Sequence, residues 1–152
     1  MSALPNDDNA ILSRANAVLG ADYVPDEDEP YMGERQQHYF RKLLIEWKRS
    51  IHTDAGSTLQ NLQDGPLREP DVADRASSET DWSIELRTRD RQRKLIAKID
   101  AALRRIDEGE YGYCEVTGDP IGLKRLIARP VATMSVEAQE AHERREKVSR
   151  DD

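Results

Sequence analysis

The sequence predicts a mainly α-helical protein, in which a long antiparallel coiled-coil hairpin is joined to a small globular module. Residues 33–63 carry apolar side chains at spacings of three and four, and a second such stripe runs from Trp82 to Ile106. Gly65-Pro66 separates the two, since proline cannot continue a helix. Both stripes are narrow and flanked by charge, which favours two helices packed on each other. A compact bundle is the alternative, but the chain offers no third long helix.

The N-terminal segment, residues 1–32, predicts a short amphipathic helix followed by an acidic linker. Gly20 would end the helix, and Pro25 and Pro30 would keep the linker extended. A helix of this length is too short to be stable alone. We therefore expect it to dock on the globular module.

The hairpin is expected over residues 33–108, with its tip near residues 65–80. A knuckle rich in glycine and proline, followed by a charged C-terminal helix, is expected over residues 109–152. Ser135 is a suitable N-cap for that last helix. Along the second long helix, acidic residues precede basic ones by four positions, the favourable order for ion pairs, as in Asp90–Lys94 and Asp100–Arg104.

The composition of the 152 residues limits the function classes. Charged residues make up 35% and aromatic residues 5%, which suits a small core with a long solvated helical element. A single cysteine excludes an intrachain disulfide framework and predicts a cytoplasmic protein. No apolar run is long enough for a membrane span. A net charge of −7 argues against direct DNA binding, and a folded-back hairpin favours a monomer.

Near the C-terminus, the chain has the spacing of a zinc ribbon without its ligands. Thiolates would be needed at four positions, which hold Cys114, Thr117, Ser135 and Ala138. One thiolate cannot build a four-coordinate structural zinc site, so we expect zinc to be absent. Apolar side chains would then hold the knuckle, and the candidates are Val116, Ile121, Leu123, Leu126, Ile127, Val131, Met134 and Val136.

Cys114 itself has three interpretations. The favoured one is a relic thiol that packs as a small hydrophobic side chain. A second is a redox-sensitive thiol, which requires exposure and a lowered pKa. A third is a metal ligand together with His142, although nothing in the sequence indicates that the two approach.

Several segments share their order and spacing with a known family. They are Asp71-Val72-Ala73-Asp74-Arg75-Ala76, then the run from Ile84 to Ile96, then Tyr111-Gly112-Tyr113-Cys114, and finally Ile121-Gly122 through Arg129-Pro130. Over roughly residues 33–148 the chain resembles the DksA/TraR family of bacterial RNA polymerase regulators.

This resemblance implies a protein that binds RNA polymerase rather than DNA. Its coiled coil would enter the secondary channel of the polymerase. There, with ppGpp, it would destabilise open complexes, repress ribosomal RNA promoters and modulate others, as in the stringent response. An enzyme acting on its own is not expected, because the sequence has no nucleophile–base pairing, phosphate-binding glycine loop or metal cluster.

Three residues match the coiled-coil tip that acts at the polymerase active centre in this family: Asp71, Asp74 and Ala76. Carboxylates on a slender arm can perturb a magnesium-bearing centre, because charges interact strongly in a confined channel. From patterning alone, Asp74 would be interpreted as a helix N-cap. The whole set of family segments favours the tip role.

Three further residues match family positions that contribute, with polymerase, to a ppGpp site: Arg91, Leu95 and Lys98. Their spacing places them on one helical face, where two cations can hold phosphates. The alternative is an ordinary solvated basic face. The family expects another cation at position 139, where this chain has Gln139, a departure that concerns the affinity for ppGpp.

Two other functions remain open from the sequence. The chain could be a coiled-coil adaptor without polymerase activity, in which case Asp74→Asn would be silent. It could also be a Gre-like transcript cleavage factor, which would need carboxylates packed more closely than Asp71 and Asp74 are.

Overall fold

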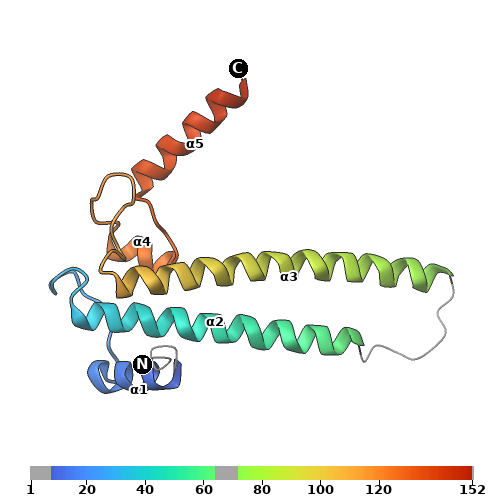
Figure 1. Cartoon of the computed structure of the whole chain (residues 1–152), viewed down its shortest axis with the longest axis horizontal. Helices are drawn as coiled ribbons and strands as arrows, with labels where there is room; N and C mark the ends of the chain where they lie inside the picture. Colours follow the sequence, from blue (N-terminus) through green and yellow to red (C-terminus); the bar gives the residue numbers. More distant parts are fainter. Residues whose placement is uncertain (1–7, 64–71, 152) are drawn as a thin grey trace. The chain divides into compact units, whose positions relative to one another are not determined.

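The computed structural model describes residues 8–63 and 72–151, with side chains for 8–54 and 79–148. Within these ranges the chain is helical, and its one pairing of extended residues is an isolated bridge between Tyr113 and Pro120. The helices are, in order, α1 (Asp8–Leu19), α2 (Glu34–Gln63), α3 (Val72–Asp107), α4 (Leu123–Ala128) and α5 (Val136–Asp151) (Figure 1). The prediction of a mainly α-helical protein is confirmed.

The chain divides into two compact units, which we call the arm and the base. The arm is Glu46–Asp100, and the base combines Met1–Ile45 with Ala101–Asp152. Each boundary falls within a long helix, so α2 and α3 both contribute to the arm and to the base.

The arm is a pair of antiparallel helical segments that lie side by side (Figure 1). Lys48, near the start of its α2 segment, contacts Asp100, at the end of its α3 segment, with 2.7 Å between Nζ and Oδ1. Asp100 thus bonds across the helix pair rather than to Arg104, the neighbour that helical spacing suggested. The Asp90–Lys94 pair is present along α3, at 3.0 Å.

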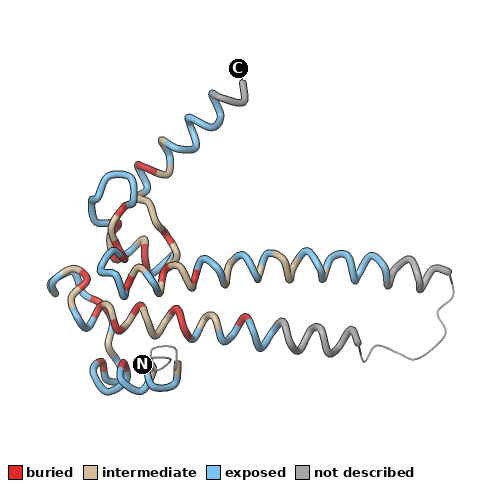
Figure 2. The backbone as a smooth tube through the Cα atoms, viewed as in Figure 1, coloured by how far each residue is buried: buried red, intermediate tan, exposed pale blue. Residues whose placement is uncertain are grey.

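Apolar burial in the arm, among its described side chains, is concentrated at Ile51 and Ile99 (Figure 2). Farther along α3, Trp82, Ile84 and Leu86 are 36%, 54% and 57% exposed. A fully buried isoleucine contributes about 1.5–3 kcal/mol through the hydrophobic effect, so Ile99 is a main contributor to the packing of the two segments.

The second long helix begins earlier than the sequence indicated. We predicted a start near Trp82, whereas α3 begins at Val72. The difference arises because residues 72–81 carry no apolar stripe, so periodicity gives no helical signal there. Of the predicted tip, residues 64–71 lie outside the described residues, and those up to 80 belong to α3.

The core of the base is formed by the N-terminal part of α2, the end of α3 and the knuckle. Its most deeply buried large side chains include Phe40, Leu44, Ile45, Ile106, Tyr111 and Leu126. The rings of Phe40 and Tyr111 lie 5.4 Å apart, which anchors the start of the knuckle on α2. Helix α1 lies beside α2 and buries Ala15 and Leu19 (Figures 1 and 2).

The linker between α1 and α2, residues 20–33, is folded into turns, and we call it the strap. The expectation of an extended linker was wrong. The Asp26 carboxylate accepts a hydrogen bond from the Asp28 N–H at 2.9 Å, while the Asp26 carbonyl accepts one from Glu29 N–H at 3.1 Å. Aspartate side chains form such local turns readily, and here they override the stiffness of the flanking prolines.

The knuckle contains a short helix, α4, that the sequence analysis did not predict. Gly122 precedes it with a φ of 105°, a conformation that favours glycine. At the start of α5, the Ser135 hydroxyl accepts a hydrogen bond from the Ala138 N–H at 3.2 Å, which confirms Ser135 as the N-cap.

The predicted apolar filling of the knuckle is only partly correct. Ile121, Leu123 and Leu126 are buried, but three other candidates are exposed: Val116 at 60%, Ile127 at 42% and Val136 at 44%. Val131 and Met134 are half-buried. Short apolar runs in loops have no periodicity that assigns them a face, so the sequence could not separate these groups.

Candidate functional site

The predicted tip residues fall at the edge of what the structure describes. Asp71 lies outside the described residues, while Asp74 and Ala76 lie in the first turns of α3 with side chains that are not described. Because α3 begins at Val72, Asp74 lies inside the helix and is not its N-cap. Acidic residues in a first turn are favoured by the helix dipole. The tip role stays a prediction.

The second predicted set forms one face of α3 in the arm. Arg91 and Lys98 are exposed, and Leu95 between them is half-buried. The Arg91 guanidinium donates a hydrogen bond to the Thr88 hydroxyl at 3.2 Å, which restrains its position along the helix. Gln139, in the base, donates its amide N–H to Glu143 on α5 at 2.9 Å.

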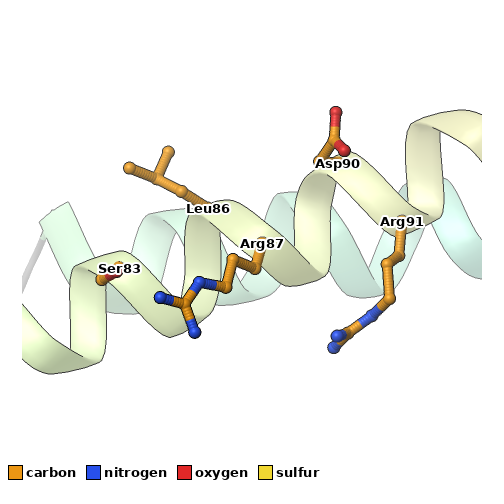
Figure 3. Close-up of a pocket in the computed structure, with 5 residues that line it drawn as sticks. All are labelled: Ser83, Leu86, Arg87, Asp90 and Arg91. Atoms are coloured by element: carbon orange, nitrogen blue, oxygen red, sulfur yellow. The ribbon is translucent and has the colours of Figure 1, made fainter.

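A shallow groove on α3 extends this face toward the start of the helix. Its lining residues are Ser83, Leu86, Arg87, Asp90 and Arg91. In Figure 3 the Arg87 and Arg91 side chains extend from the same side of the helix, and Leu86 and Asp90 project from the opposite side. The groove therefore combines two guanidinium groups on one side of the helix with an exposed apolar group and a carboxylate on the other.

The charges around the groove sum to a positive surface. Lys94 and Arg93 both bond to the Asp90 carboxylate and hold its pKa below its usual range. Asp90 is thus ionised but already paired. Arg87 makes no ion pair or hydrogen bond with a described residue, so its charge is available to a partner. Such a surface fits an acidic ligand or an acidic protein surface.

In the knuckle, Cys114 is buried within a tight loop. Its N–H donates to the Asp119 carbonyl at 2.7 Å, and its own carbonyl accepts from the Gly118 N–H at 2.8 Å. Burial raises the pKa of the thiol, but the Ser135 N–H, the Thr117 hydroxyl and N–H, and the Val116 N–H all donate to the sulfur. These donors outweigh burial and lower the pKa of Cys114 to about 6.

Comparison with known proteins places these features in a family. A family model described as the N-terminal domain of the DnaK suppressor protein DksA matches residues 36–106. A second, described as a prokaryotic dksA/traR C4-type zinc finger, matches residues 109–144. A Caulobacter vibrioides protein named RNA polymerase-binding transcription factor DksA is 63% identical over 135 residues, 89% of this chain and 95% of that relative. The chain belongs to the DksA family.

Other members agree with this assignment. The Haemophilus influenzae protein of the same name is 44% identical over 125 residues, which cover 82% of this chain and 86% of that relative. The solved structure of transcription factor DksA2 from Pseudomonas aeruginosa superimposes with a TM-score of 0.71 at 43% identity, over 81% of this chain and 93% of that one. The resemblance inferred from the sequence segments is confirmed.

The DksA-family zinc finger implies a metal, and the donor set of this chain does not fit one. Only Cys114 offers a thiolate, and Ala138 has no donor atom. The Thr117 and Ser135 hydroxyls accept backbone hydrogen bonds from Asp119 and Ala138, each at 3.2 Å. Within the described part of the chain, no three histidine, cysteine or acidic side chains gather as metal ligands.

Sequence reasoning missed two features of this DksA-family chain. It assigned no role to Arg87 of the groove, although its position on the Arg91 face follows from helical spacing. It also missed Tyr31, which contacts knuckle residues more than eighty positions away. No local pattern signals a contact of that separation.

Proposed function

We propose that this DksA-family chain is a transcription factor that binds RNA polymerase through its secondary channel. With ppGpp it destabilises open complexes, represses ribosomal RNA promoters and modulates others. The observation that carries the proposal is the arm, whose α3 presents exposed cationic and apolar side chains, in a chain 63% identical to a protein named RNA polymerase-binding transcription factor DksA.

The dimensions of the arm suit this role. The α3 segment of the arm, residues 72–100, corresponds to about 44 Å at 1.5 Å per residue. A pair of helices of this length is slender enough to enter a channel that a globular domain cannot. The first turns of α3 carry Asp74 and Ala76, so these proposed tip residues would lie near the end of the arm that enters the channel.

The charge distribution supports polymerase rather than DNA as the partner. The chain as a whole carries a net charge of −7, while three exposed cations, Arg87, Arg91 and Lys98, share one face of α3. Such a face meets an acidic protein surface or an anionic ligand, whereas the overall charge repels nucleic acid. The protein would act without catalytic activity of its own, as a cytoplasmic monomer.

We propose ppGpp as the co-effector, bound with polymerase at the face of Arg91, Leu95 and Lys98. Arg91 and Lys98 are exposed cations on the same helical face and can hold phosphate groups. Leu95 offers an apolar surface beside them. Gln139 supplies no charge, and its amide already bonds to Glu143. We also propose that zinc is absent, because one thiolate and two hydroxyls that accept backbone hydrogen bonds cannot form a tetrahedral zinc site.

The proposed function predicts that Asp74→Asn abolishes inhibition while binding persists. The full chain is titrated into transcription from a ribosomal RNA promoter by bacterial RNA polymerase, with and without ppGpp. Inhibition that deepens with ppGpp is expected for the native chain. Asp74→Asn should lose most of it, because the substitution removes a negative charge at the tip and little volume.

Asp81→Asn is the matched control, since it makes the same change at an exposed position farther along α3. It should inhibit like the native chain. A silent Asp74→Asn together with no polymerase binding would favour the adaptor. Shortening of transcripts in stalled complexes on addition of the native chain would favour the Gre-like cleavage factor.

A further inference from the structure

The strap and the knuckle are joined by one phenolic hydroxyl. Tyr31 donates a hydrogen bond to the Gly112 carbonyl at 2.6 Å and accepts one from the Gly122 N–H at 3.0 Å. Gly112 lies just before the Cys114 loop and Gly122 just before α4, so the two bonds bracket that loop. The Tyr31 side chain, from the N-terminal segment, thus links the two ends of a loop in the knuckle.

The strap packs so closely against Gly112 that a residue with a side chain would not fit at this position. A Cβ there would lie 2.9 Å from Met32 Cγ, 3.1 Å from Met32 Sδ and 3.2 Å from the Tyr31 oxygen, and the φ of Gly112 is +93°. The Tyr31 ring also meets the Tyr113 ring edge-on, with centroids 5.6 Å apart. The strap is therefore seated directly on the backbone of the knuckle.

The strap also makes hydrogen bonds with side chains of α2. Met32 has a φ of 54°, which L-residues adopt only when their surroundings impose it. Gln36 supplies part of that constraint: its side chain accepts from the Met32 N–H at 2.8 Å and donates to the Asp26 carbonyl at 3.1 Å. Gln37 donates to the Met32 carbonyl at 2.7 Å.

The Tyr31 hydroxyl stays in its donor form at neutral pH. Burial raises the pKa of this group, and the donors at Gly122 and Ile121 offset only part of the shift. The hydrogen on the phenol is thus present for the bond to Gly112. Because the side chain is half-buried, water competes weakly for both bonds.

We propose that Tyr31 is a latch through which the N-terminal segment controls the order of the knuckle. The knuckle has only one of the four thiolates that would close it around a metal, and its loops are held by separate hydrogen bonds. Some of these are internal, such as Ile121 N–H to Gly112 at 2.8 Å and Glu115 N–H to Thr133 at 2.9 Å. The latch adds a bond from outside, so displacement of the strap loosens the loop around Cys114.

The test is hydrogen exchange of the full chain bearing Tyr31→Phe. The substitution keeps the ring and removes both hydrogen bonds. The Gly122 amide loses its acceptor, so its exchange should accelerate about five- to tenfold, the effect of one lost hydrogen bond. Peptides of the Cys114 loop should exchange faster as well, while peptides of the arm keep their native rates.

Tyr113→Phe is the matched control. It removes the same atom from the ring beside Tyr31, but the Tyr113 hydroxyl makes no hydrogen bond with a described residue. Its exchange pattern should equal that of the native chain. Native rates at Gly122 in Tyr31→Phe would overturn the proposal, and so would equal acceleration in the arm and the knuckle, which indicates general destabilisation.

A second variant covers the case in which Tyr31→Phe does not fold. Gln37→Ala loosens the strap from the side of α2, because the side-chain hydrogen bond of Gln37 goes to the Met32 carbonyl in the strap. The latch predicts a smaller but measurable acceleration at Gly122 in this variant. Unchanged knuckle exchange, with faster exchange confined to the strap, would contradict it. These readouts do not involve polymerase, so they are independent of the proposed function.

Discussion

At Cys114, burial and hydrogen bonding push the pKa in opposite directions. Burial alone favours the neutral thiol, yet backbone N–H groups of Ser135, Thr117 and Val116 converge on the sulfur with the Thr117 hydroxyl. Small polar residues at former ligand positions thus still support an anion at residue 114. The thiol is buried, as expected for a small hydrophobic side chain, but its environment is polar.

The Cys114 thiol should titrate with a midpoint near pH 6, against an ordinary value of 9.0. Thiolate absorbance reports this group alone, because the chain has a single cysteine. Thr117→Val removes the hydroxyl donor and should raise the midpoint. A native midpoint near 9 would show that the N–H groups do not reach the sulfur in solution.

The same shift predicts a pH-dependent stability. A folded-state pKa below the unfolded value stabilises the folded chain fully above about pH 9, and this contribution is lost as the pH falls to about 6. The free energy of unfolding of the native chain relative to Cys114→Ser should therefore grow between pH 6 and pH 9. Chemical denaturation of both proteins at several pH values measures it.

Within the helices of the arm, exposure differs sharply between two isoleucines of α3. Ile99 is fully buried, whereas Ile84 is 54% exposed. The predicted apolar stripe contained Ile99 but not Ile84, and the structure shows that Ile99 is the one that packs. Farther along α3, the exposed Leu86 lines the same groove as Arg87 and Arg91.

Ile99→Ala should lower the free energy of unfolding by about 2–5 kcal/mol, because it removes buried methyl groups and leaves a cavity. Ile84→Ala is the matched control, with the same change in helix propensity, and should cost about 0.5 kcal/mol or less. Urea denaturation followed by circular dichroism compares the two. Equal losses would mean that the arm packs farther along α3 than its exposed side chains indicate.

For the molecule as a whole, the single thiolate at the zinc-ribbon positions and the packing of the two arm segments on each other give a joint prediction. Native mass spectrometry should show a single species of 17.3 kDa with no zinc bound. The arm packs its own two segments through Ile51 and Ile99, so a second copy is not needed to bury them. The melting temperature should be unchanged by a chelator. Stoichiometric zinc would contradict the expected absence of metal, and a species of twice the mass would contradict the expected monomer.

Much of this molecule could be predicted from local sequence. Apolar periodicity and the Gly65-Pro66 break indicated two long helices, and the structure describes α2 over Glu34–Gln63 and a second long helix, α3. The Ser135 cap and the insufficient zinc ligands also follow from residue type and spacing alone. The tip residues and the Arg91 face came from ordered family segments, and their roles stay predictions. The helices, the cap and the missing ligands depend on residue types and on neighbours within a few positions, and both can be read from the sequence.

Other features were decided only by the tertiary structure. Asp100 had a suitable partner four residues away, yet it bonds to Lys48 across the arm. Val116 and Val136 matched the apolar filling of the knuckle but face solvent. Tyr31 reaches Gly112 and Gly122, 81 and 91 positions away. Contacts at such separation depend on how whole elements pack, and periodicity, propensity and capping contain no information about that packing.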